Sequence, residues 1–195
     1  MTTTPTHHEI ATWISEKKYL TEDCHAADFG GSLGVVIDNQ LTPQQEKTLL
    51  KNTHTPPPGS MTYKDGDRSF VGACPVADTT LALKYYHRLN LRRQIGYTMF
   101  GSRAMKAWIA SRVLTKLGIQ TPRPIAILEY RRLGLLIDNC LFATEVAKGT
   151  PLPQYVEQYS EDEAKMDIVA ANCKNIFDRF AQYRIYHSDT TAKNF

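Results

Sequence analysis

The chain has 195 residues, of which 42% are hydrophobic and 22% are charged, a composition typical of a soluble globular protein. Its net charge of +3 gives no indication of nucleic-acid binding, which usually depends on a dense basic surface. The four cysteines lie far apart without a C-x-x-C pair, which argues against a structural zinc site and against a disulfide framework. The first residues do not form a secretory signal, and no stretch approaches the roughly 20 apolar residues that span a bilayer. These features predict a cytoplasmic protein.

Residues 1–58 are predicted to form an N-terminal appendage that ends in a linker. A short amphipathic pattern covers Glu9–Tyr19, with Trp13 on its apolar side. The sequence Thr42-Pro43-Gln44-Gln45 is typical of a helix N-terminus, with Thr as the cap and Pro at the first helical position. The stretch "NTHTPPPGS" then predicts a boundary near residue 58, because prolines and glycine interrupt regular structure.

Residues 59–150 have the pattern of an antiparallel sheet with one helix. "MTYKDGDRSFVGA" predicts two strands around a turn at Asp65-Gly66, and "TTLALKYY" predicts a third strand with Leu81 and Leu83 on one face. Apolar residues recur at helical spacing over 102–117, where Ser102 can cap the first turn. "PIAILEY", "GLLI" and "CLFATEV" predict further strands.

Residues 151–195 are expected to contain a long helix and a polar loop. Ser160 and Glu163 have the spacing of a capping box at the start of this helix. The loop "YHSDTTAKNF" follows it. His187, Asp189 and Asn194 spell H-x-D-x-x-x-x-N, the spacing of a kinase catalytic loop. In such a loop the Asp accepts the proton of the attacking hydroxyl and the Asn holds a magnesium ion.

A lysine suitable for a kinase site lies earlier in the chain. Lys84 ends "LALK", which matches in type the V-A-I-K strand whose lysine neutralises the phosphates of ATP. Taken alone, Lys84 also fits a solvent-facing strand lysine, and the His187 motif also fits a polar loop after a helix. Their order in the chain, with the long helix directly before the loop, favours the kinase interpretation. The fold class predicted is therefore α+β, with a protein-kinase-like small lobe and the beginning of a helical large lobe.

Two other patterns have alternative explanations. Asp28-Phe29-Gly30 spells D-F-G, but a metal-binding D-F-G follows the catalytic loop in sequence. "GGSLGVV" resembles half of a glycine-rich loop, but Gly34 lies 50 residues before Lys84, too far for one hairpin. Both are therefore interpreted as a turn in the appendage. The basic run Lys84–Arg93 fits either a solvated loop or a surface that faces an acidic sugar or lipid head group.

Several motifs together resemble the lipopolysaccharide kinases of the Kdo/WaaP family. They are a Ser-Arg-Ala helix that carries a Trp, "LGIQTPRPIA", "TEVAKGTPL" and "HSDTTAKNF", and they cover roughly residues 60–195. The resemblance implies a bacterial enzyme that uses ATP and Mg²⁺ to phosphorylate a sugar hydroxyl of the lipopolysaccharide inner core. It also implies cytoplasmic work at the inner face of the inner membrane, with peripheral membrane contact.

The resemblance also implies roles for individual residues. Lys84 matches the phosphate-binding lysine, Asp189 the catalytic base and Asn194 a magnesium ligand, while His187 orders the loop. The segment from Glu145 to Ala147 matches the hinge whose backbone binds adenine.

The sequence departs from a complete kinase pattern in three places. The helix over 102–117 has no Asp or Glu to pair with Lys84, no G-x-G-x-x-G precedes Lys84, and no metal-binding D-F-G follows Asn194. The chain is therefore expected to be a truncated kinase. The alternatives are a catalytically inactive kinase-like binding module, or a kinase for a protein or another small-molecule hydroxyl. Apolar residues of the long helix further predict self-association.

Overall fold

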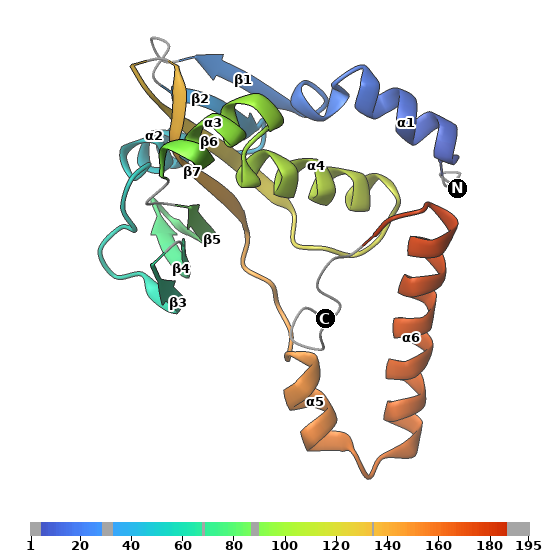
Figure 1. Cartoon of the computed structure of the whole chain (residues 1–195). Helices are drawn as coiled ribbons and strands as arrows, with labels where there is room; N and C mark the ends of the chain where they lie inside the picture. Colours follow the sequence, from blue (N-terminus) through green and yellow to red (C-terminus); the bar gives the residue numbers. More distant parts are fainter. Residues whose placement is uncertain (1–4, 29–32, 68, 87–89, 134, 187–195) are drawn as a thin grey trace. The chain divides into compact units, whose positions relative to one another are not determined.

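The computed structural model describes residues 5–28, 33–67, 69–86, 90–133 and 135–186 (Figure 1). Contacts divide the chain into two compact units, Met1–Ala147 and Lys148–Phe195. The strands are, in chain order, β1 (Cys24–Asp28), β2 (Leu33–Asp38), β3 (Met61–Gly66), β4 (Ser69–Val76), β5 (Thr79–Tyr86), β6 (Pro124–Arg132) and β7 (Leu136–Glu145). The helices of the first unit are α1 (His7–Ser15), the 3₁₀ turn η1 (Lys18–Leu20), α2 (Pro43–Lys51), α3 (Leu91–Phe100) and α4 (Arg103–Lys116). The second unit contains α5 (Leu152–Tyr159) and α6 (Glu163–Gln182).

The described strands form one antiparallel sheet in the order β1-β2-β6-β7-β5-β4-β3. The α+β class and the antiparallel sheet predicted from the sequence are therefore confirmed. Strands β3 and β4 form the predicted hairpin, but the turn is not at Asp65-Gly66, because these residues end β3 and pair with Phe70 and Ser69 of β4. Strand β5 is the predicted strand with Leu81 and Leu83 buried on one face. The segments "GLLI" and "CLFATEV" were predicted as separate strands, but Leu136–Glu145 forms a single strand, β7.

One face of the sheet is covered by α2. Leu49 of α2 is fully buried and belongs to an apolar cluster with Leu81, Leu83 and Tyr85 of β5. The helix begins as predicted, since the Thr42 hydroxyl accepts a hydrogen bond from the Gln45 N–H and the Gln45 side chain accepts one from the Thr42 N–H. A capping box of this kind satisfies two N–H groups that the first helical turn leaves free.

Helices α3 and α4 lie on the other face of the sheet. Trp108 of α4 is fully buried in a second apolar cluster with Tyr86, Ile127 and Cys140, and its indole N–H donates to the Tyr19 carbonyl at 2.7 Å. Ser102 caps α4, as predicted. The expectation of one helix on the sheet is wrong, because α3 packs on β7 beside α4. The sequence analysis treated the start of α3 as part of a basic loop.

Residues 1–58 do not form a separate appendage. Strand β2 pairs with β6, so the hairpin of β1 and β2 extends the same sheet that contains Lys84. The stretch 30–36, interpreted as a turn, contributes Leu33 and the residues after it to β2, and Asp28 lies in β1. Helix α1 is tied to α4 through Glu22, which accepts hydrogen bonds from the Trp13 indole and from Lys116.

The second unit consists of α5 and α6 joined by a short turn. The predicted capping box at Ser160 and Glu163 is wrong, because Ser160 ends α5. Asp162 caps α6 instead, and its carboxylate accepts a hydrogen bond from the Lys165 N–H at 3.1 Å. Aspartate and serine side chains can both accept a hydrogen bond from a free N–H group of the first helical turn. Asp162 does so here, and the cap of α6 lies two residues after the predicted one. Within the residues described, no helix is long and apolar enough to cross a bilayer.

Candidate functional site

Lys84 lies on the face of the sheet that carries α3 and α4. Side chains along a strand alternate between faces, and the buried Leu83 and Tyr85 point to the α2 side. Lys84 therefore points to the opposite side, where it is half-buried. Its direct neighbours across the sheet are Val71 of β4 and Phe142 of β7.

A patch of half-buried side chains surrounds Lys84. Six residues of three adjacent strands form it in two rows: Val71–Lys84–Phe142 and Ala73–Ala82–Thr144. We call this set the β4–β5–β7 patch. The next row towards the helices, which includes Tyr86 and Cys140, is buried. The patch is thus an accessible part of this face, and its two alanines have small side chains.

The electrostatic surroundings of Lys84 are positive. Burial lowers the pKa of the Lys84 ammonium, and the charges of Lys64 and Arg103 lower it further. The ammonium lies 5.2 Å from the centre of the Tyr86 ring, and no carboxylate of the described residues forms an ion pair with it. The helix over 102–117 has no Glu, so Lys84 lacks a counter-ion among the residues that the structure describes. An anion that binds beside Lys84 would supply one.

The predicted hinge residues lie next to the β4–β5–β7 patch. Glu145 is the last residue of β7 and pairs with Leu81, one residue before Ala82. Its N–H donates to the Arg123 carbonyl at 3.0 Å, and its carboxylate accepts a hydrogen bond from Arg123 Nε at 2.6 Å. Both interactions hold the end of β7 in place. Within the described part of the chain, no hydrogen bond engages the main chain of Val146 or Ala147, so these groups can receive a ligand.

The other predicted site residues lie outside the described residues. These are His187, Asp189 and Asn194. The structure therefore brings Lys84 together with the segment 145–147 through the pairing of β5 and β7, and it leaves the geometry of the H-x-D loop as a prediction. Among the described side chains, no group of three His, Cys, Asp or Glu is arranged to hold a metal ion.

Two residues of this region were not identified from the sequence, Ala73 and Arg123. Ala73 forms part of the patch, and the Arg123 side chain hydrogen-bonds to the Glu145 carboxylate. The alternation in "LALK" places Ala82 on the face of Lys84, as the structure has it. Ala73 and Arg123 become relevant only through strand pairing and through a contact across 22 residues, so no local pattern could have indicated them.

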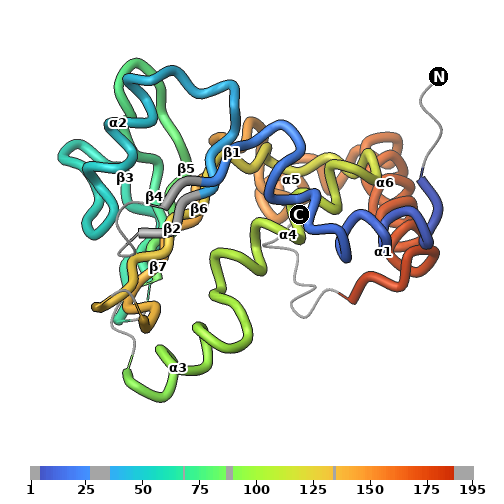
Figure 2. The backbone as a smooth tube through the Cα atoms, turned by 90° about the horizontal axis from the view of Figure 1, so that it is seen from above, coloured from blue at the N-terminus to red at the C-terminus, as the bar shows by residue number. Residues whose placement is uncertain are grey.

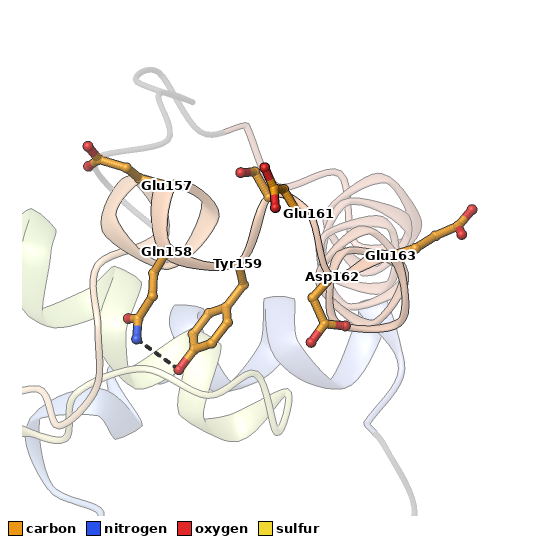
Figure 3. A pocket seen from close by; sticks show the side chains of 7 residues that line it. Glu157, Gln158, Tyr159, Glu161, Asp162 and Glu163 are labelled. Carbon is orange, nitrogen blue, oxygen red and sulfur yellow. Dashed lines mark hydrogen bonds between the residues drawn. The ribbon is translucent and has the colours of Figure 1, made fainter.

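A separate acidic hollow lies at the corner between α5 and α6. Its lining includes Glu157, Tyr159 and Glu163 (Figure 3). Figure 3 shows Glu157 and Glu163 pointing away from each other, and the hydrogen bond drawn there joins Gln158 to the Tyr159 hydroxyl. These carboxylates do not converge on a common point, so this hollow has no arrangement suited to a metal ion or to acid–base chemistry.

Comparison with known proteins gives no neighbour for this chain: no protein-family model, no curated protein and no solved structure matches it. Functional inference therefore depends on the residues themselves.

Proposed function

We propose that this chain carries the ATP-binding lobe of a kinase that phosphorylates a sugar hydroxyl of the lipopolysaccharide inner core. The observation that carries the proposal is the position of Lys84. It is a half-buried cation without a carboxylate partner in the described residues, on an accessible patch of small and apolar side chains beside the end of β7. Support also comes from the order of elements after α2, from a strand pair through the lysine strand, helices and two strands to a long helix, which is similar to that expected for a protein-kinase small lobe and the start of its large lobe.

The β4–β5–β7 patch offers complementary groups for each part of ATP. The alanine row suits the flat adenine ring, and the main chain of Val146 and Ala147 can pair with its polar edge. Lys84 would then meet the phosphates, and the positive charges of Lys64 and Arg103 add to the attraction. The N-terminus of α4 contributes a further partial positive charge on the same side.

The transfer step in this proposal uses residues of the H-x-D loop. The acceptor hydroxyl gives its proton to the carboxylate of Asp189, and its oxygen forms a bond to the γ-phosphorus of ATP. The bond from that phosphorus to the β–γ bridging oxygen breaks, and ADP leaves. Asn194 would hold Mg²⁺, which supplies charge neutralisation at the phosphates. His187 would order the loop.

Binding of Mg-ATP by isothermal titration calorimetry tests the role of Lys84. Lys84→Ala should weaken binding by about 10–100-fold, because it removes a charge-assisted contact to phosphate. Lys47→Ala is the matched control, since Lys47 is exposed on α2, which covers the opposite face. Equal affinity of wild type and Lys84→Ala would contradict the proposal.

A transfer assay separates the kinase from its main alternative, a catalytically inactive binding module. The alternative is favoured by the absence of any Asp or Glu from 102–117, the helix that in an active kinase supplies a partner for the lysine. Labelled ATP and a lipopolysaccharide core acceptor should give transfer with the intact protein, and Asp189→Ala should abolish turnover with ATP affinity unchanged. ATP binding that depends on Lys84 without any transfer would instead identify a binding module. Transfer only to another hydroxyl acceptor would correct the substrate and leave the kinase assignment intact.

A further inference from the structure

Helix α3 packs on the sheet through polar side chains and exposes apolar ones. On its inner side, Gln94 is buried and donates to Asp138 at 2.8 Å, and the Thr98 hydroxyl accepts a hydrogen bond from the Ile137 N–H. Tyr97 is the aromatic residue that packs partly against the second apolar cluster. This arrangement reverses the usual one, in which a surface helix buries its apolar face.

The outer side of α3 carries an exposed apolar stripe. Leu91, Ile95 and Met99 follow each other at intervals of four residues, and Phe100 adjoins them. The exposed fractions are 63%, 43%, 69% and 72% in that order. Figure 2 shows α3 at the margin of the first unit, beyond the strands. Four large apolar side chains on one short helix are more than scattered surface exposure explains.

Positive charge accompanies this stripe. A hollow beside it, between α3 and the start of α4, is lined by Arg92, Arg93 and Lys106 together with Tyr97 and Phe100. The stretch 79–128, which includes both helices, has nine Lys and Arg residues and no Asp or Glu. The carboxylate of Asp138 lies on the sheet side of α3 and accepts a hydrogen bond from Gln94. The outer surface therefore combines protruding apolar groups with cations.

We infer that this surface, which we call the α3 face (Leu91, Arg92, Ile95, Met99, Phe100 and Lys106), docks onto an anionic lipid surface. Apolar side chains at this position can enter the boundary between head groups and acyl chains, while the cations meet lipid phosphates. A protein partner with an apolar groove would match the stripe, but the lack of carboxylates from 79 to 128 favours a surface of uniform negative charge. The inference does not depend on nucleotide binding.

Vesicle flotation tests the inference with the chain as it is. The protein should float with vesicles of equimolar phosphatidylcholine and phosphatidylglycerol, and it should not float with phosphatidylcholine alone. High salt should weaken the binding without abolishing it, because salt screens charges and leaves apolar insertion intact.

Matched variants locate the binding surface. Met99→Ser should lower the vesicle partition coefficient about fivefold, because it removes an inserted apolar side chain. Met61→Ser should leave it unchanged, since Met61 is 64% exposed but lies on β3 at an edge of the sheet. The pair Arg92→Gln and Lys106→Gln should lower it by at least about tenfold. The control pair is Lys47→Gln and Lys51→Gln, both exposed on α2.

Three outcomes would overturn the inference. They are no flotation with anionic vesicles, an equal loss for Met61→Ser and Met99→Ser, and binding that depends on the arginine and lysine alone and is fully displaced by inorganic phosphate. The last outcome would indicate a site for a soluble anion. All variants change exposed side chains, and unchanged thermal melting would show that they fold.

Discussion

Gly72 is a position where the sheet leaves no space for a side chain. A Cβ atom added there would lie 2.6 Å from the carbonyl oxygen of Met61 and 2.6 Å from the Phe70 ring. The first neighbour is backbone and cannot move away without disturbing the pairing of β3 and β4. Gly72 thereby keeps β4 close to its neighbours beside the candidate site.

Gly72→Ala should therefore lower the free energy of unfolding by about 1–3 kcal/mol, as overpacking in a core does. Gly96 provides the opposite case, because a Cβ there meets nothing within 4 Å and the residue lies inside α3. Gly96→Ala should raise stability by about 0.5–1 kcal/mol, since alanine restricts the unfolded chain. Urea denaturation midpoints measure both changes. Similar midpoints for the two variants would contradict the packing at β3 and β4.

Cys140 makes stability sensitive to alkaline pH. Burial raises the pKa of its thiol to about 11, against the partial compensation of hydrogen bonds from Ala104 and Ser102. The unfolded chain releases this proton near the ordinary thiol pKa, whereas the folded chain retains it. Stability is therefore fully present below about pH 8.5 and is lost as the pH rises towards 11.

The expected loss from this thiol is about 2–3 kcal/mol over that range, at 1.36 kcal/mol for each unit of pKa difference. Denaturation curves at pH 7.5–10.5, a range of about three units around the ordinary thiol pKa, should be flatter for Cys140→Ala than for wild type. Cys173→Ala, on α6, is the control and should keep the wild-type slope. If Cys140→Ala lost stability with rising pH as steeply as wild type, the alkaline loss of stability would come from other groups. Burial also raises the pKa of the Tyr86 hydroxyl to about 12, so the folded protein retains this proton to a higher pH than the Cys140 thiol proton.

At the scale of elements, short sequence patterns predicted most of the strands. They also predicted the helices whose first turn has a clear capping residue. Thr42 and Ser102 were correctly identified, because a cap depends on residues only two or three positions away. Helix α3 was missed, because its apolar residues face outward and its basic residues suggested a loop. The start of α6 was displaced, because Ser160 and Asp162 are both competent caps and the sequence offers no measure of where α5 ends.

Asp162→Ala should destabilise the first turn of α6 by about 1 kcal/mol, whereas Ser160→Ala should have little effect. Hydrogen exchange of the Lys165 amide reports this directly, since that N–H donates to the Asp162 carboxylate. Faster exchange in Asp162→Ala alone is the expected result. Faster exchange in Ser160→Ala alone would instead indicate that Ser160 and Glu163 form the capping box.

At the scale of the whole molecule, contacts divide the chain between Ala147 and Lys148, directly after the candidate hinge segment. The predicted boundary near residue 58 lies inside the first unit, whereas the one at residue 150 lies near this division. In the second unit, Ile168 of α6 is 61% exposed and Phe177 is 43% exposed. Exposed apolar residues along one helix are a surface for association.

Ile168→Ser should shift the sedimentation profile of the concentrated protein towards the monomer. Leu135→Ser is a suitable control, because Leu135 is 69% exposed and lies in the first unit. A wild-type protein that sediments as a monomer at high concentration would refute association through α6. A similar shift in both variants would place the association surface elsewhere.

The sequence by itself determined the features that depend on near neighbours. Strand alternation placed Lys84 opposite Leu83, the pattern of two short strands over 61–73 indicated the hairpin of β3 and β4, and Ser102 set the start of α4. These follow from backbone geometry over two to four residues. Only the tertiary structure decided that β2 pairs with β6, that Ala73 and Thr144 flank Ala82, and that α3 turns its apolar side outward. Each of these depends on which distant segments exclude water from each other, and many pairings satisfy the same local pattern.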